Sequence, residues 1–141
     1  MLNTFIFAID KDDYSVVAYR YFNRIEIYSH EGEYISHFRL SSIPEKASIN
    51  ERGLPENVLI KGVTIDHKNR IAILIGGDSE EERRKVYIFS RSGDLLDSLT
   101  LPERSRLIRF DNYGNLYATA LEGTVLKKYK IRDEDINRMK N

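Results

Sequence analysis

Short runs of alternating apolar and polar residues follow one another along the chain, and most have the length of a β-strand. The first four runs are 5–9, 15–19, 24–28 and 34–40, which are rich in β-branched and aromatic residues. An acidic turn at 10–13 and a turn at Gly32 separate neighbouring runs. This pattern predicts a four-stranded antiparallel unit over approximately residues 4–42.

The same pattern returns twice after a connection over residues 43–57, which contains two prolines and Gly53. The second unit is expected at 58–103, with strands at 58–65, 70–75, 85–90 and 95–101. The third unit, at 105–132, has candidates for three strands and none for a fourth. Residues 133–141 are highly charged and are expected to form a tail or a short helix. The chain is therefore expected to form a single domain over 1–141.

Two pairs of segments indicate that these units are internal repeats. Residues 24–35 and 85–96 share a cation, an alternating strand, a serine, a turn glycine, an acidic residue and two apolar residues, in the same order. Residues 61–72 and 106–117 share an apolar strand that ends in aspartate, a tight turn and a second apolar strand. Repeats of this kind build arrays of sheets in which each unit packs on its neighbours.

The order of these elements resembles the NHL-type repeat of six-bladed β-propellers. Residues 62–101 and 108–129 carry the resemblance best, and residues 5–40 fit it more loosely. The Trp-Asp pair of WD40 blades is absent, since the chain has no tryptophan. The resemblance implies an all-β fold, a β-propeller-like array of three units of the four-stranded antiparallel type, equivalent to half of a six-bladed ring.

Three blades leave both ends of the array uncovered, because each blade buries its faces against neighbouring blades. Two copies could associate into six blades, the remaining blades could belong to a longer chain, or the stack could stay open with polar end faces. We expect self-association of two half-propellers. A clean monomer at micromolar concentration would contradict that expectation.

Composition narrows the classes of function. The 141 residues contain 22 Lys and Arg and 22 Asp and Glu, so no overall field attracts nucleic acid or a membrane surface. The absence of cysteine excludes disulfides, thiolate nucleophiles and Cys-ligated zinc, and leaves the compartment open. Residues 1–9 lack a basic region, and their apolar run ends at Asp10. We therefore expect a soluble chain without a signal peptide or membrane span.

Asp66 and Asp111 are the weak candidates for a metal site, since each follows the first strand of its unit. Calcium-dependent lactonases of similar fold place acidic ligands at the propeller face, so calcium is the ion that the resemblance would imply. The alternative is that each carboxylate accepts backbone N–H groups two residues further on and so forms the turn. Repetition at matching positions favours this turn role, so the chain is expected to need no cofactor.

No motif for catalysis stands out. His30, His37 and His67 lack the spacing of a metal-binding pair, and the sequence has no Gly-x-Ser-x-Gly motif. Gly76 and Gly77 precede acidic residues, which would repel a phosphate group. The chain is more consistent with a binding protein than with an enzyme.

Candidate binding residues lie in segments that do not repeat, namely 19–24, the connection 41–57 and the charged loop 76–84. The segment 19–24 combines tyrosine with arginine, which are enriched where proteins bind one another. The alternative, which the strand pattern favours, is a strand and hairpin whose aromatic residues alternate between the core and the neighbouring blade. Loop 76–84 could be a docking element or an ordinary solvated loop. The candidates are Tyr19, Arg20, Tyr21, Arg24, Glu81, Arg83 and Arg84.

The sequence thus predicts a non-catalytic recognition scaffold that binds a protein or peptide through its blade loops. A metal-dependent hydrolase of the lactonase type and a structural fragment of a larger propeller are the alternatives. Calcium or EDTA should shift the melting temperature only if the hydrolase alternative holds.

Overall fold

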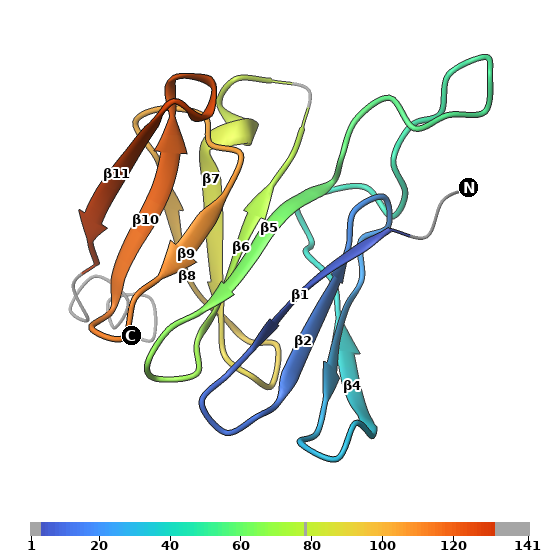
Figure 1. Cartoon of the computed structure of the whole chain (residues 1–141). Helices are drawn as coiled ribbons and strands as arrows, with labels where there is room; N and C mark the ends of the chain where they lie inside the picture. Colours follow the sequence, from blue (N-terminus) through green and yellow to red (C-terminus); the bar gives the residue numbers. More distant parts are fainter. Residues whose placement is uncertain (1–3, 78, 132–141) are drawn as a thin grey trace.

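Three antiparallel β-sheets lie side by side in the computed structural model, which describes residues 4–77 and 79–131 (Figure 1). The first sheet has the order β1-β2-β3-β4 and the second β5-β6-β7-β8. The third has the order β11-β10-β9. The strands are β1 Phe5–Ile9, β2 Ser15–Tyr19, β3 Ile25–Tyr28, β4 Tyr34–Phe38, β5 Ile60–Ile65, β6 Ile71–Ile75, β7 Lys85–Phe89, β8 Leu95–Thr100, β9 Ile108–Phe110, β10 Asn115–Ala120 and β11 Val125–Lys130. Two short 3-10 turns, η1 Glu82–Arg84 and η2 Leu121–Gly123, complete the elements.

The sequence prediction of an all-β array is confirmed. Every strand pairs with the next one along the chain within its sheet, as expected for meanders. The third sheet has three strands in the described part of the chain. The predicted tail over 133–141 lies outside the described residues.

The first strands of the three sheets adjoin one another. β5 contacts β1 on one side and β9 on the other, so the three sheets fan out from a common inner edge (Figure 1). This placement makes the first sheet face the second sheet, and the second sheet face the third.

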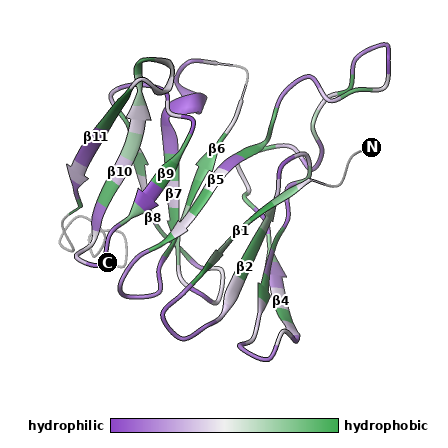
Figure 2. Ribbon diagram, in the orientation of Figure 1, coloured by the Kyte–Doolittle hydropathy of each residue, from purple (hydrophilic) through white to green (hydrophobic). Residues whose placement is uncertain are grey.

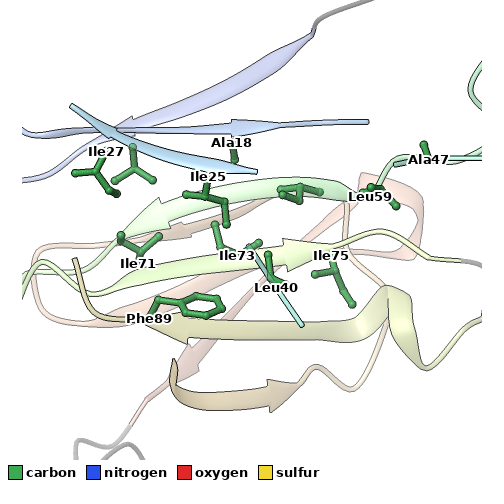
Figure 3. Close-up of a cluster of buried hydrophobic side chains, with 12 residues drawn as sticks. Ala18, Ile25, Ile27, Leu40, Ala47, Leu59, Ile71, Ile73, Ile75 and Phe89 are labelled. Atoms are coloured by element: carbon green, nitrogen blue, oxygen red, sulfur yellow. The ribbon is translucent and has the colours of Figure 1, made fainter. Parts of the chain in front are cut away.

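Two hydrophobic clusters fill the spaces between the sheets. One lies between the first and second sheets and contains Ile25, Ile27, Ile73 and Phe89 among its buried residues (Figure 3). The other lies between the second and third sheets and includes Leu74. Figure 2 shows apolar residues along the strands and hydrophilic residues at the lower turns.

Strand β6 contributes to both clusters, which explains its continuous apolar sequence. Ile71, Ile73 and Ile75 face the first sheet, whereas Ala72 and Leu74 face the third. All five residues are buried. A strand with solvent on one face would instead alternate apolar and polar residues.

One turn geometry recurs throughout the described chain. In each turn the backbone N–H of the first residue donates to the carbonyl of the fifth, and the N–H of the fourth donates to the carbonyl of the first. The fourth residue has a positive φ, from 60° at Asn69 to 91° at Gly93, which favours glycine or asparagine. The first residues of these turns are Asp10, Ser29, Asn50, Asp66, Ser90 and Asp111.

A cluster of charged and polar side chains joins the turns of the first two sheets. The Arg91 guanidinium lies 4.1 Å from the centre of the Tyr14 ring and donates through Nε to Asp10 Oδ2 over 3.0 Å. Arg91 Nη2 also donates to Asp12 Oδ2 at 2.9 Å, and the Asn69 amide donates to the same oxygen at 2.8 Å. This cluster fixes the two sheets relative to each other at one end of their interface.

Replacing Ile73 by alanine should lower the free energy of unfolding by about 2–5 kcal/mol, because it opens a cavity between the first two sheets. Ile49→Ala, at an exposed position of the connection, is the matched control and should change it by less than about 0.5 kcal/mol. Urea unfolding followed by circular dichroism measures both. Equal losses for the two variants would contradict the assigned core.

Candidate binding groove

A surface groove of about 640 Å³ lies where the β2–β3 turn, the end of β4 and the connection to β5 meet. Its walls combine aromatic and cationic side chains with a smaller number of acidic and amide groups. The lining residues are Tyr19, Phe22, Asn23, Arg24, His37, Phe38, Arg39, Glu45 and Lys46.

Asn23 holds the connection against the first sheet and so shapes the groove. Its Nδ2 donates to the carbonyls of Leu40 at 2.6 Å and Ile43 at 3.2 Å, while its Oδ1 accepts from the backbone N–H of Leu40 at 2.8 Å. Two backbone bonds, from Asn23 N–H to Glu45 and from Ala47 N–H to Tyr21, continue the attachment. Because the Asn23 side chain is buried and fully bonded, the wall that carries Glu45 and Lys46 is a defined part of the fold.

A buried carboxylate lies beside the groove. Glu26 Oε1 accepts from the hydroxyls of Tyr19 at 2.6 Å and Tyr28 at 3.3 Å, and Oε2 accepts from Arg24 Nε at 3.0 Å. The sheet register places Tyr19, Arg24 and Glu26 close together at the ends of β2 and β3. The network orients the Tyr19 ring and the Arg24 guanidinium at the groove wall.

The same network perturbs acid–base equilibria. The hydrogen bond to the Glu26 carboxylate, together with burial, raises the pKa of Tyr19 to about 12. Burial by itself would raise the pKa of Glu26, but hydrogen bonds from Tyr19 and Arg24 outweigh it and place that pKa below its ordinary value. Glu26 therefore stays ionised and Tyr19 stays neutral near neutral pH.

Of the predicted residues in this segment, Tyr19 and Arg24 line the groove, whereas Arg20 and Tyr21 do not. Tyr21 packs against the hydrophobic cluster between the first two sheets. The backbone of Arg20 joins three segments, since its N–H donates to Thr4 and its carbonyl accepts from Leu59 and Ile60. The structure thus divides the segment 19–24 between the groove wall and the core.

The second group of predicted residues lies at a different place. Arg83 Nε donates to the Gly77 carbonyl at 2.9 Å, and Arg84 Nη1 donates to the Pro102 carbonyl at 3.2 Å. Glu81 is exposed at the start of η1. None of the three lines the groove, so the structure does not bring the two predicted sets together.

The carboxylates of Asp66 and Asp111 are bonded within their turns. Oδ1 of Asp66 accepts from the backbone N–H groups of Lys68 and Arg70, both at 2.9 Å, and Oδ2 accepts from Arg70 Nε at 2.6 Å. Asp111 accepts through Oδ1 from Tyr113 at 2.8 Å and Asn115 at 3.0 Å, and through Oδ2 from the Asn115 amide. Among residues 4–77 and 79–131, no group of three or more His, Asp or Glu side chains is arranged to hold a metal ion.

Sequence reasoning missed several groove residues and one member of the turn set. Asp10 makes the same bonds as Asp66, since its Oδ1 accepts from the N–H groups of Asp12 and Tyr14. An aspartate directly after an apolar strand was the signal that could have revealed it. Asn23 and Lys46 lie in the candidate segments 19–24 and 41–57 without a signal of their own, and Arg39 lies outside both; only the folded connection brings the three to one groove.

Solved structures with a similar fold include β-propellers. A protein of unknown function from Bacteroides caccae matches with a TM-score of 0.57 and 14% identity, over 89% of this chain and 41% of that one. A virginiamycin B lyase from Staphylococcus aureus matches with a TM-score of 0.54 and 13% identity, over 89% and 40% respectively. The β-propeller domain of Cps50 (Swd1) from Myceliophteria thermophila matches at 0.51 and 11%, over 96% and 45%.

The three sheets have the fold of consecutive β-propeller blades. Because these identities are low, the likeness shows the fold alone. The chain spans 40% to 45% of the length of these similar structures. No family model and no curated protein matches the sequence, so the NHL assignment stays a prediction. In the described part of the chain, no helix has the length and apolar character needed to cross a membrane.

Replacing Glu26 by glutamine should lower the pKa of Tyr19 from about 12 toward 10, because the hydroxyl loses its charged acceptor. Since the folded pKa is raised, this bond contributes stability that is present below about pH 10 and is lost as pH rises through about 12. NMR titration of ¹³Cζ-labelled tyrosine follows Tyr19 individually. Glu31→Gln, an exposed control, should leave its titration unchanged; a Tyr19 pKa that Glu26→Gln does not move would contradict the network.

Proposed function

We propose that this chain is a non-catalytic recognition module that binds an acidic protein or peptide segment in the groove beside Tyr19 and Arg24. The observation that carries the proposal is the meeting of two non-repeating segments, 19–24 and 41–57, at one aromatic and cationic groove. Part of each segment packs in the hydrophobic cluster between the first two sheets, and other residues of each line the groove. Loops held on a rigid sheet scaffold are common sites of binding.

The charge of the groove supports an acidic ligand. The chain as a whole is balanced, yet the groove is lined by Arg24, Arg39 and Lys46 and by a single acidic residue, Glu45. Arg24 is engaged by Glu26, so Arg39 and Lys46, which are both exposed, supply the positive charge at the mouth. Opposite charge on a ligand would speed its association and orient it.

The aromatic residues support a peptide rather than an isolated anion. Tyr19, Phe22 and Phe38 line the same groove and offer apolar area for side chains of a bound segment. Aromatic and arginine side chains together are typical of the residues that contribute most to binding energy in protein interfaces. A nucleic acid would call for a longer basic surface than this groove provides.

One observation favours a second, compatible proposal, that the chain works as part of a larger propeller. It spans 41% of the Bacteroides caccae structure and 40% of the virginiamycin B lyase. In that case the groove would be one recognition element of a complete ring. A lactonase-like activity has no comparable support, since both Asp66 and Asp111 carboxylates are used in turns.

Selection of a random linear peptide library on the immobilised chain tests the binding proposal. We expect enrichment of acidic peptides. Their affinity should fall at least about tenfold in the double variant Arg39→Glu and Lys46→Glu, because the charge at the mouth is reversed.

Arg52→Glu is the matched control, since Arg52 is an exposed cation on the same connection and does not line the groove. Fluorescence anisotropy should give it an affinity within about twofold of the parent chain. Failure to enrich any peptide, or equal loss in the control, would overturn the proposal.

A further inference from the structure

The outer face of the first sheet carries large apolar side chains that no part of the described chain covers. Phe5, Phe7 and Ile9 alternate along β1 on the face opposite to the hydrophobic cluster, and all three are exposed, Phe7 by 61%. A row of exposed phenylalanine and isoleucine on one strand marks a surface that binds another apolar surface.

The turn aspartates show what kind of surface belongs there. Asp10, Asp66 and Asp111 end the first strands of the three sheets in the same geometry, so residues can be compared by their distance from the aspartate. Phe7, Val63 and Ile108 are each the third residue before it. Val63 packs against the first sheet and Ile108 is buried against the second.

In both other sheets, the residue equivalent to Phe7 is therefore covered by the preceding blade. The same holds for Ile9, because its counterparts Ile65 and Phe110 pack against the preceding sheet in the same way. The outer face of the first sheet has the chemistry of an interface between blades.

The opposite end of the array offers a matching surface. The outer face of the third sheet has an apolar depression of about 530 Å³, lined in part by Leu107, Tyr117 and Leu126. Leu107 is 63% exposed and Leu126 is 64% exposed. Arg109 and Lys128 lie opposite Tyr117 on the two neighbouring strands and add positive charge to this face.

We propose that a second copy of this chain covers the first sheet with the outer face of its third sheet, so that Phe7 packs against Leu107 of the other copy. The contact between the second and third sheets of one chain indicates which residues should pair between two copies. Gly62 is the fourth residue before Asp66, and a Cβ atom there would lie 3.3 Å from Cγ1 of Ile108. Leu107 occupies the position of Gly62, and Phe7 that of Ile108.

The pairing also fits the residue sizes and the polar groups at the two faces. The second sheet presents glycine to Ile108, whereas the third presents Leu107 beside a depression that can receive the larger Phe7 ring. Within the chain, Arg91 pairs with Asp10 across the first two sheets. In the equivalent turns His30, whose Nε2 lies 3.6 Å from Glu31 Oε1, takes the position of Arg91, and Asp111 takes that of Asp10, so the His30 imidazole and the Asp111 carboxylate would lie opposite each other.

The number of blades fits a closed ring. Two copies would bring the assembly near the length of one similar structure, since one copy spans 41% or 40% of the first two. A two-fold axis forms both interfaces at once, so no end face of either array remains uncovered.

Cysteine cross-linking tests the pairing directly, because the chain has no natural cysteine. Mixing the single variants Phe7→Cys and Leu107→Cys under mild oxidation should give a covalent dimer on a non-reducing gel, and neither variant alone should do so. The control mixture of Leu54→Cys and Leu121→Cys uses residues of similar exposure, 52% and 61%, away from both faces. It should yield no more dimer than random collision gives.

Native mass spectrometry and light scattering at about 10 µM should find a dimer of the parent chain. Phe7→Glu and Leu107→Glu should each weaken it at least about tenfold, while Leu54→Glu should not. Both residues are exposed within one chain, so circular dichroism should show that each variant keeps its fold. A parent chain that is monomeric, or a dimer insensitive to both glutamates, would overturn the proposal, and the face would then be open or covered by a different partner.

Discussion

Burial of the second sheet between the other two is the interaction on which the rest of the structure depends. Strand β6 places isoleucines on one face and Ala72 and Leu74 on the other, and both faces are shielded from water. Removal of apolar area from water is the main favourable term in folding, and the second sheet contributes such burial on both of its faces. Among residues 4–77 and 79–131, the first and third sheets each bury one face in this way. Their remaining faces are the source of the exposed apolar surface at both ends.

The recurring turn makes this packing repeatable. Asp, Ser or Asn at its first position bonds the backbone of the following residues, and a residue with positive φ closes the turn. In all three sheets the first strand ends at the residue before the turn aspartate, since β1 ends at Ile9, β5 at Ile65 and β9 at Phe110. The same residues that first suggest ion ligands, Asp66 and Asp111, have their oxygens occupied by this structural task. Candidate function therefore concentrates in the segments that depart from the repeat.

The strands and the fold class could be predicted because they rest on local patterns. The apolar residues at 71–75 and the alternation at 85–89 identify strands without reference to distant parts of the chain. The groove could be predicted only in part. Tyr19 and Arg24 were identified from their type, but Asn23, Arg39 and Lys46 had no distinguishing pattern. Their roles depend on where the connection folds back onto the first sheet. The buried Asn23 amide fixes that place by donating to the carbonyls of Leu40 and Ile43.

The sequence by itself determined the repeat, the strand order within each unit and the residues that form the turns, because all three follow from neighbours in the chain. Only the tertiary structure decided which faces are covered and which remain exposed. Phe7 and Ile108 stand at equivalent positions, yet Phe7 is exposed and Ile108 is buried, since in the described part of the chain a preceding sheet packs against Ile108 and none packs against Phe7. It also decided that Glu26 is a buried, ionised carboxylate rather than a surface charge, because Tyr19 and Arg24 converge on it only when β2 and β3 pair.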